Sequence, residues 1–347
     1  MTDSPETIPV RDAHRFDEAA LADHLLPVLG IAGPLVVRQM KGGQSNPTFL
    51  LEAGGEEFIL RKQPPGQLLP SAHAVDREYR VITALAATDV PVPRTLHFCA
   101  DRAVIGTPFY VMERLRGRLF WNPALPELAR EERAAIWEGM ADALARLHRA
   151  DWQALGLADF GRPGNYFTRQ IARWTRQWAD SKTHDNPAID RLAEWLPPRV
   201  PPGDETSICH GDFRIDNLMF HPTEPRVIGI LDWELATLGH PLADLAYNCI
   251  QYHTPPDVFR GLAGLDLDAL GVPSQDRHVA VYAARIGKPI ALTPFHLAFA
   301  MFRLAVIVEG ILARAKAGNA ASADAFEVGA LGEIFARIGW DIAARAD

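Results

Sequence analysis

The chain has 347 residues, of which 48% are hydrophobic and 22% are charged. These proportions are ordinary for a globular protein and exclude a chain dominated by disorder, and at roughly 150 residues per domain the length predicts two domains or lobes. The formal net charge of −8 disfavours a protein whose main task is to bind nucleic acid, because such proteins usually carry excess positive charge.

The first third of the chain predicts a small β-rich lobe that begins with a helix. Apolar residues recur at helical spacing over residues 15–29, where we expect an amphipathic helix. Short strand-like runs separated by turn residues follow. The expected elements are strands at Leu35–Met40, Thr48–Glu52 and Glu57–Arg61, a helix at Ala72–Ala87, and strands at Arg94–Cys99 and Pro108–Arg114.

The rest of the chain has mostly helical periodicity, with one strand-rich island. We expect helices at Glu127–Arg149, Tyr166–Asp180 and Pro187–Leu196, strands within Ser207–Trp233, and helices from Leu242 onward. This order predicts an α+β protein. Residues 1–114 should form a small N-terminal lobe, and residues 115–347 a large helical C-terminal lobe.

The spacing of the cysteines and the apolar stretches indicate in which cellular compartment the protein is expected. Cys99, Cys209 and Cys249 are far apart and form no C-x-x-C pair, so neither a disulfide framework nor a cysteine-rich zinc site is expected. The N-terminus lacks the apolar run of a signal peptide. The most apolar stretch, Pro294–Leu312, contains an arginine and a glutamate and should be a buried core helix rather than a membrane span. We therefore expect a cytoplasmic protein without a membrane partner.

The most informative segment is CHGDFRIDNLMF at 209–220, which is followed by the apolar run Val227–Leu231 and by Asp232. An aspartate at the end of a buried strand is costly unless it is paired or binds a cation. The oxygens of Asn217 and Asp232 are hard ligands of the kind that Mg²⁺ uses beside phosphate oxygens. Asp212 is then free to orient a substrate hydroxyl. The alternative is that Asp212 only caps a turn.

The pattern H-G-D-x-x-x-x-N followed by I-L-D-W-E resembles the catalytic and metal-binding segments of the aminoglycoside phosphotransferase family. The resemblance extends over nearly the whole chain and implies a two-lobed, protein-kinase-like fold. The segments GGQSNPTF, LRKQPPGQLLPSAHAVDREYRV and HGDFRIDNLMF are most similar to one subgroup. That subgroup comprises the kinase domain fused ahead of acyl-CoA dehydrogenases in some animals and its stand-alone bacterial relatives.

The resemblance implies an ATP-dependent small-molecule O-phosphotransferase that uses Mg²⁺. Asp212 would be the catalytic aspartate, which accepts the proton of the acceptor hydroxyl or orients its oxygen. Asn217 and Asp232 would hold Mg²⁺ against the nucleotide phosphates. His210 would be structural and would position the loop.

A glycine-containing segment, MKGGQSN, lies between two strand-like runs of the N-terminal lobe. Gly42, Gly43 and Ser45 are the candidate nucleotide contacts there, because glycines let backbone N–H groups approach phosphates. The segment departs from the G-x-G-x-x-G pattern of protein kinases. The alternative is a plain hairpin turn.

The strand Glu57–Lys62 should provide the cation for the α- and β-phosphates. Strand alternation places Ile59 and Arg61 on one face and Lys62 on the other. By resemblance to protein kinases, this register selects Arg61, a departure from the usual lysine. Lys62 stays an alternative, and either residue could instead be a solvated charge at the strand end.

Two further segments complete the expected nucleotide site. Glu78 lies near the inward face of the helix that follows this strand, where the resemblance makes the strand cation its partner. The alternative is an ordinary surface carboxylate. By resemblance, Met112 lies beside the adenine, and the C=O of Glu113 and the N–H of Leu115 bind its edge.

The acceptor is expected to be a small molecule. Roughly ten residues separate Asp232 from the next helix, which leaves little room for the peptide platform of a protein kinase. Arg169, Arg173 and Arg176 form a stripe on the helix Tyr166–Asp180. We hypothesise that this stripe holds an anionic acceptor such as a hydroxyacyl-CoA; the alternative is a solvated helix face.

Two other functions compete with this interpretation. The chain could be a catalytically silent nucleotide-binding module, which the irregular glycine segment and Arg61 favour. The set of Asp212, Asn217 and Asp232 argues against it, because a module without chemistry has no need of all three. It could also be a kinase of an aminoglycoside or an amino alcohol, although a polycation would require a carboxylate-lined pocket. The sequence leaves the oligomeric state open.

Overall fold

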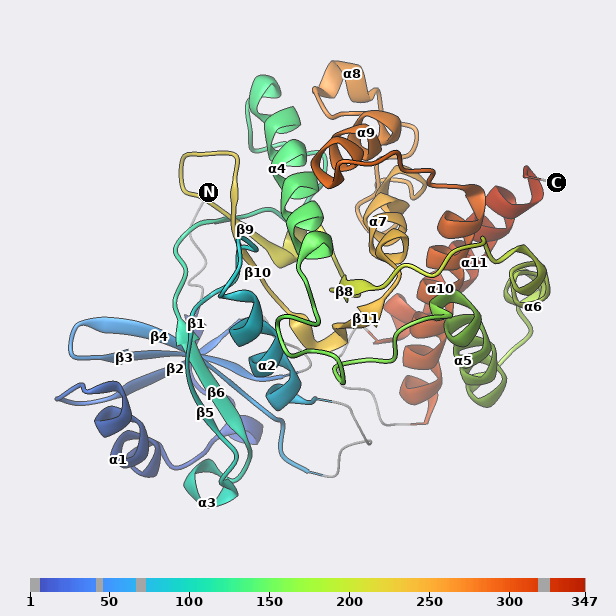
Figure 1. The fold of residues 1–347 in the computed structure, drawn as a ribbon. Coiled ribbons are helices and arrows are strands. Elements are labelled where there is room, and N and C mark those ends of the chain that lie inside the picture. Colours follow the sequence, from blue (N-terminus) through green and yellow to red (C-terminus); the bar gives the residue numbers. More distant parts are fainter. Residues whose placement is uncertain (1–6, 42–45, 67–72, 318–324, 347) are drawn as a thin grey trace. The chain divides into compact units, whose positions relative to one another are not determined.

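The computed structural model describes residues 7–41, 46–66, 73–317 and 325–346. The chain divides into two compact units: Met1–Gly117 with Ile228–Glu234, and Arg118–Val227 with Leu235–Asp347 (Figure 1). The first unit thus ends three residues later than the expected boundary at residue 114. The first unit also includes residues 228–234 from later in the chain, and Asp232 therefore belongs to the first unit.

A six-stranded antiparallel sheet forms the framework of the first unit. Its strands in spatial order are β1 (Thr7–Ile8), β2 (Val36–Met40), β3 (Thr48–Ala53), β4 (Glu56–Lys62), β6 (Phe109–Glu113) and β5 (Thr95–Cys99). The helices of this unit are α1 (Glu18–Leu29), α2 (Val75–Leu85) and α3 (Arg102–Ile105), with a 3₁₀ turn at Asp12–His14. The predicted strands and the two longer helices are confirmed to within a few residues at each end.

The two faces of this sheet carry different side chains because successive strand residues alternate. On one face, Leu21 and Leu25 of α1 pack with residues of β3, β4 and β6 in a buried apolar cluster that Phe58 and Leu60 of β4 join. On the other face, α2 contacts β5 and β6. The residue between Leu60 and Lys62, Arg61, faces this second side.

Helices dominate the second unit. The helices are α4 (Arg130–Arg149), α5 (Tyr166–Ser181), α6 (Pro187–Trp195), α7 (Pro241–Cys249), α8 (Leu267–Leu270), α9 (Gln275–Ile286), α10 (Pro294–Lys316) and α11 (Ala325–Ala344). Four 3₁₀ segments lie at Pro197–Arg199, Ile215–Asn217, Trp233–Leu235 and Ile250–Tyr252, the third of which spans the boundary between the units. In this unit β7 (Arg118–Leu119) pairs with β9 (Leu218–Phe220), and β8 (Ser207–Cys209) pairs with β11 (Thr237–Gly239). The strand β10 (Val227–Ile230) leads back to the first unit.

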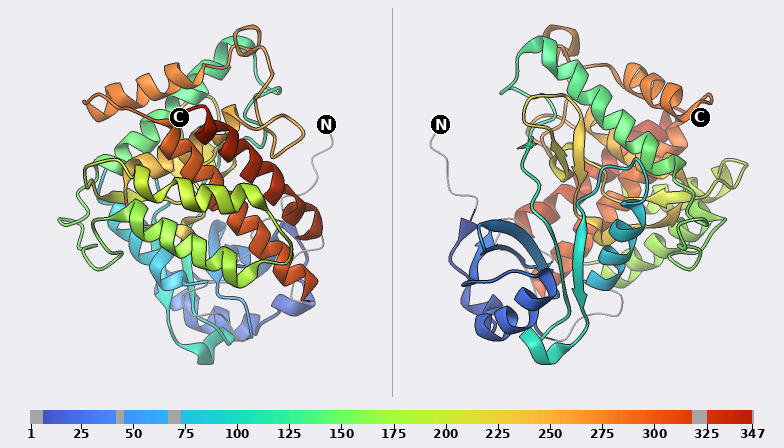
Figure 2. Two further views of the ribbon diagram at one scale, coloured as in Figure 1. Left: turned by 90° about the vertical axis from the view of Figure 1, so that its right-hand side faces the viewer. Right: turned by 60° about the vertical axis from the view of Figure 1, so that its left-hand side comes forward.

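The long apolar helix α10 is the central packing element of the second unit. It contacts α5, α6, α7 and α11, and it lies beside α11 along its length (Figure 2). Thr293 and His296 form a capping box at its start. Among the described residues, α10 is the helix long and apolar enough to cross a membrane, yet 83% of its most apolar window is buried inside the protein. The prediction of a buried core helix is confirmed.

The elements that the sequence did not predict are short. They include β1, α3, β7 and α8, each of two to four residues. Elements of this length span only about one period of hydrophobic alternation, so no repeat is available for periodicity to detect.

Candidate active site

Arg61 lies at the centre of a charged cluster in the first unit. Its Nε is 2.8 Å from Oε2 of Glu78 on α2, and its Nη2 donates to Oδ1 of Asp232 at 2.6 Å. Arg61 is 8% exposed and Glu78 is 1% exposed. Burial disfavours the guanidinium charge, but the two carboxylates outweigh it and hold the pKa of Arg61 above its ordinary value. The predicted ion pair between Glu78 and a strand cation is confirmed, and the cation is Arg61.

Neighbouring polar groups fix Glu78 in place. Asn46 donates to its Oε1 at 2.5 Å, and the Tyr110 hydroxyl donates to its Oε2 at 3.0 Å. Tyr110 stands opposite Arg61 in the β4–β6 register, so both side chains point to the α2 side of the sheet. A fully buried carboxylate with these partners is a fixed anchor for the arginine.

Lys62 lies on the opposite face of the sheet. Its Nζ is 5.3 Å from the ring centroid of Phe16, and burial lowers its pKa. The alternation predicted from the sequence is confirmed, and it separates the two candidate cations. Arg61 is the one beside Glu78 and Asp232.

The strand β6 leads into the segment expected to contact adenine. Met112 pairs with Ile59 and therefore shares the face of Arg61. The N–H of Glu113 donates to the carbonyl of Arg94 at 2.9 Å, so the contact predicted for Glu113 concerns its carbonyl. The side chain of Leu115 lies against Gly229, where an added Cβ would stand 2.2 Å from a Leu115 methyl. The predicted glycine-segment residues Gly42, Gly43 and Ser45 lie outside the described residues.

Asp212 and Asn217 come together on the loop that follows β8 in the second unit. The side-chain nitrogen of Asn217 donates to both the backbone carbonyl and Oδ2 of Asp212, each at 2.9 Å. The Tyr247 hydroxyl donates to Oδ1 of Asp212 at 2.6 Å. Arg214 places its Nε 3.3 Å from the same oxygen. The Asp212 side chain is 23% exposed, so the carboxylate is held and still reachable from solvent.

Asp244 of α7 anchors this loop through its backbone. Its carboxylate accepts the backbone N–H groups of His210 at 2.5 Å and Gly211 at 2.9 Å. Burial disfavours its charge, but the hydrogen bond from His148 and those from the backbone prevail and lower the pKa of Asp244. Gly211 has a φ of +85°, and a Cβ built on it would lie 2.7 Å from the carbonyl oxygen of Leu235. A side chain at this position would clash with that backbone.

Two residues of the candidate site were missed by sequence reasoning. Arg303 of α10 is 9% exposed and donates to the carbonyl of Gly211 at 2.8 Å. Tyr247 of α7 holds Asp212. The signal that could have found Arg303 was an arginine in the middle of a largely apolar helix, which is costly to bury unless a partner is present. His210 is fully buried, and its Nδ1 accepts the N–H of Asp212, in keeping with a structural role.

The predicted metal ligands have suitable donor atoms. Asn217 uses its side-chain nitrogen in both hydrogen bonds to Asp212, which directs the amide oxygen away from that carboxylate. Asp232 is 37% exposed at the side chain and engages Arg61 through one oxygen. Amide and carboxylate oxygens suit a hard cation such as Mg²⁺. Asp232 lies in the first unit and Asn217 in the second.

Comparison with known proteins decides the family. The family model described as "Phosphotransferase enzyme family" matches residues 36–278, which is well over half of the chain. The chain belongs to the phosphotransferase enzyme family. The phosphotransferase is similar to the crystal structure of a Ralstonia eutropha protein described provisionally as an aminoglycoside phosphotransferase, with a TM-score of 0.87, 48% identity and coverage of 95% of this chain and 99% of that one. By family and fold, it is a small-molecule kinase.

More distant structures show the same fold. Aminoglycoside phosphotransferase APH(4)-Ia, solved with ADP and hygromycin B, matches the phosphotransferase with a TM-score of 0.62 at 15% identity, over 93% of this chain and 98% of that one. This likeness confirms the predicted protein-kinase-like α+β fold, because related proteins keep their fold after most of their sequence identity has been lost. It carries no statement about the acceptor.

Curated relatives are longer proteins. The phosphotransferase is 42% identical over 346 residues to mouse acyl-CoA dehydrogenase family member 10, covering 98% of this chain and 32% of that protein. It is 43% identical over 356 residues to chicken acyl-CoA dehydrogenase family member 11, covering 99% of this chain and 46% of that protein. The phosphotransferase therefore spans less than half the length of these relatives, and the resemblance to the region fused with acyl-CoA dehydrogenases is confirmed.

Proposed function

We propose that this phosphotransferase transfers the γ-phosphoryl group of ATP to a hydroxyl group of a small molecule in a Mg²⁺-dependent reaction. The observation that supports this most directly is the Asp212 carboxylate, held at both oxygens on a loop that Asp244 and Arg303 anchor. A fixed, solvent-accessible carboxylate is what the orientation of an attacking hydroxyl requires. The complexes of APH(4)-Ia with ADP and with AMP-PNP support nucleotide use.

In this proposal, separate groups of residues bind the acceptor and the nucleotide. Asp212 orients the acceptor hydroxyl and takes its proton, while Arg61, held by Glu78, binds the nucleotide phosphates. Asn217 and Asp232 would hold Mg²⁺, which would supply positive charge to neutralise the transferring phosphoryl group. Met112, the carbonyl of Glu113 and the N–H of Leu115 would contact the adenine, and the nucleotide contacts of Gly42, Gly43 and Ser45 stay predictions from the sequence.

For the acceptor we favour a hydroxyacyl-CoA. The phosphotransferase matches a region of proteins named acyl-CoA dehydrogenases, and a kinase linked to such an enzyme would act on a related thioester. Arg173 and Arg176 of α5 are exposed and suit the phosphates of coenzyme A. Arg173 lies over the ring of Trp174 at 5.0 Å, whereas Arg169 donates to the carbonyl of Arg162 and is less accessible to a ligand.

The test is Mg²⁺-dependent release of ADP from ATP in the presence of one acceptor at a time. The acceptor panel is hydroxyacyl-CoA thioesters, free hydroxy acids, aminoglycosides and amino alcohols. Asp212→Asn should abolish acceptor-stimulated turnover while Mg·ATP still binds. Asp257→Asn, an exposed residue of the same unit, is the matched control and should leave turnover unchanged.

The outcomes separate the competing functions. If only aminoglycosides stimulate turnover, the acceptor is an aminoglycoside and the proposal of a thioester acceptor is wrong. Nucleotide binding without turnover for any acceptor would favour the silent module. If the thioesters do stimulate, Arg173→Glu should raise KM for the thioester without changing KM for ATP. An unchanged KM for the thioester would remove the arginine stripe from the acceptor site.

A further inference from the structure

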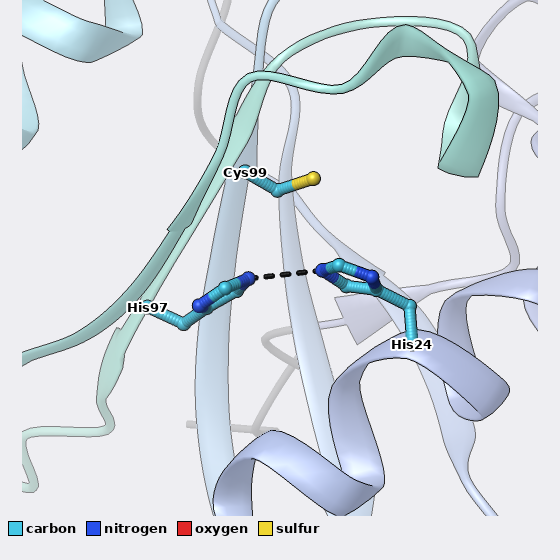
Figure 3. A group of neighbouring side chains, drawn as sticks. All are labelled: His24, His97 and Cys99. Carbon is cyan, nitrogen blue, oxygen red and sulfur yellow. Dashed lines mark hydrogen bonds between the residues drawn. The ribbon is translucent and has the colours of Figure 1, made fainter.

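Three side chains that commonly bind transition metals converge between α1 and β5 of the first unit, on the face of the sheet opposite Arg61. Nε2 of His24 lies 3.0 Å from Nε2 of His97, and these nitrogens and the Cys99 sulfur all lie within 4.8 Å of one another. Figure 3 shows the two imidazole rings meeting edge to edge, with the Cys99 side chain beside them. We call this group the His–His–Cys cluster.

A β-bulge brings His97 into this cluster. Thr95 pairs with Met112, but His97 pairs with Val111 rather than Tyr110, so one extra residue lies between these two pairs. Without the bulge, strand alternation would place His97 on the α2 side together with Thr95. With it, His97 and Cys99 stand opposite Val111 and Phe109 and face α1.

The amphipathic pattern of α1 supplies the third side chain. Leu21 and Leu25 are fully buried in the apolar cluster beneath the helix. His24 lies three residues after the first and one before the second, at the edge of the buried stripe. His24 and His97 are each partly exposed, while Cys99 is 4% exposed. The cluster is therefore accessible to an ion from solvent on its histidine side.

Metal binding at this cluster requires neutral imidazoles and a deprotonated thiol. Burial lowers the pKa of His97, and the adjacent His24 lowers it further. Neutral imidazole is the form that binds metals. Burial raises the pKa of the Cys99 thiol, so the sulfur binds a metal only by releasing its proton to solvent.

We infer that the His–His–Cys cluster binds one Zn²⁺ ion through Nε2 of His24, Nε2 of His97 and Sγ of Cys99, with a water molecule as fourth ligand. Imidazole and thiolate are ligands for zinc and other late transition metals rather than for Mg²⁺. In tetrahedral zinc the two nitrogens lie about 3.3 Å apart, so the present 3.0 Å requires a small opening of the pair. The ion would join α1 to the edge strand β5.

A second group of residues with metal-binding side chains is not a candidate metal site. It consists of His148, Cys209 and Asp244. Both Asp244 oxygens accept backbone N–H groups of the Asp212 loop, and Nδ1 of His148 is 2.7 Å from the Tyr282 hydroxyl. This group is engaged in holding the loop. In the His–His–Cys cluster, by contrast, the two imidazole nitrogens contact each other.

The test uses the full chain freed of metal by a chelator, with excess Mg²⁺ present so that hard-cation sites do not interfere. Co²⁺ serves as the spectroscopic probe. We expect a thiolate-to-cobalt charge-transfer band that saturates at one equivalent and disappears when Zn²⁺ is added. Zn²⁺ should also raise the melting temperature, because it binds only the folded chain.

Single substitutions test which side chains bind the metal. Cys99→Ala should abolish the charge-transfer band, while Cys249→Ala, which removes another buried free thiol, should leave it intact. His24→Gln should keep the fold, because the side chain is partly exposed, and should weaken Zn²⁺ binding by about tenfold or more. Absence of the band in the wild type, its persistence in Cys99→Ala, or unchanged affinity in His24→Gln would overturn the inference.

Discussion

At the scale of single residues, the central feature is that both oxygens of the Asp212 carboxylate accept hydrogen bonds from side chains. Asn217 comes from the same loop, five residues away, and the motif spacing predicts their proximity. Tyr247 comes from α7, and no local pattern links it to Asp212. Burial, followed by the nearby Asp212 charge, raises the pKa of Tyr247, so the hydroxyl stays protonated and donates.

Tyr247→Phe should lower kcat by roughly tenfold or more while KM for ATP stays the same. A hydrogen bond to a charged group contributes about 1.5 to 3 kcal/mol, and here it fixes the direction of the carboxylate. Steady-state kinetics with saturating acceptor measures the effect. Tyr252→Phe is the control, since that hydroxyl donates to the carbonyl of Pro273 and not to Asp212. Equal kcat in Tyr247→Phe and wild type would contradict the positioning role.

Arg61→Met should lower the free energy of unfolding by about 3 to 5 kcal/mol, because it leaves Glu78 buried without its cation. The comparison variant is Arg38→Met on β2, whose partner Glu52 is 3.6 Å away and whose own side chain is 55% exposed. That exposed pair should contribute less than about 1 kcal/mol. Urea unfolding of both variants measures the difference, and similar losses would show that the Arg61 pair is not specially stabilising.

At the scale of elements, α10 and α11 pack closely because glycine stands where their surfaces meet. A Cβ at Gly332 of α11 would lie 2.7 Å from Oε1 and 2.8 Å from Cγ of Glu309. Glu309 is 1% exposed, and Asn186 donates to its Oε1 at 3.2 Å. The glutamate therefore has little space in which to move, and α11 has no room for a side chain at this position.

Gly332→Ala should lower the free energy of unfolding by about 1 to 3 kcal/mol through overpacking. Gly310→Ala in α10 is the matched change, since its nearest contact is Gln177 Nε2 at an ordinary 3.4 Å. That variant should gain up to about 1 kcal/mol from the better helix propensity of alanine. Thermal or urea unfolding decides the matter, and a stabilised Gly332→Ala would contradict the packing argument.

Periodicity predicted the longer elements well and the contacts between them poorly. The strand alternation around Arg61 and the buried apolar helix at Pro294–Leu312 follow from local rules and were predicted correctly. The bulge that turns His97 toward α1 depends on how β5 pairs with β6, which local alternation does not encode. For the same reason the sequence predicted helices from Leu242 onward, but it did not predict that Asp244 of α7 accepts hydrogen bonds from the Asp212 loop.

At the scale of the whole molecule, acid sensitivity should arise from histidines that are buried in the neutral form. Burial lowers the pKa of His278 to about 4. Its Nε2 lies 2.7 Å from Oδ1 of Asn248, and its ring meets that of Trp137 edge to face. His296 is a second case, with a pKa of about 4 that burial also lowers.

The free energy of unfolding should fall by about 2 kcal/mol on account of His278 between about pH 7 and pH 5. The unfolded chain binds a proton at this residue below its ordinary pKa of 6.5, while the folded chain does not until about 4, so stability is complete above 6.5 and decreases as the pH falls. Urea unfolding of wild type and His278→Gln at both pH values isolates the contribution. The variant should have the smaller pH dependence, and equal slopes would contradict the assignment.

The path of the chain also limits how the protein can be divided into fragments. A fragment that ends at Gly117 would contain Arg61 and Glu78 but would lack Asp232, and would leave the carbonyl of Pro91 without the N–H of Ile230, which it accepts at 2.8 Å. Such a fragment would expose surface that Ile228–Glu234 covers in the intact chain. Split-protein complementation or segmental isotope labelling of this enzyme should therefore graft residues 228–234 onto the N-terminal piece through a flexible linker.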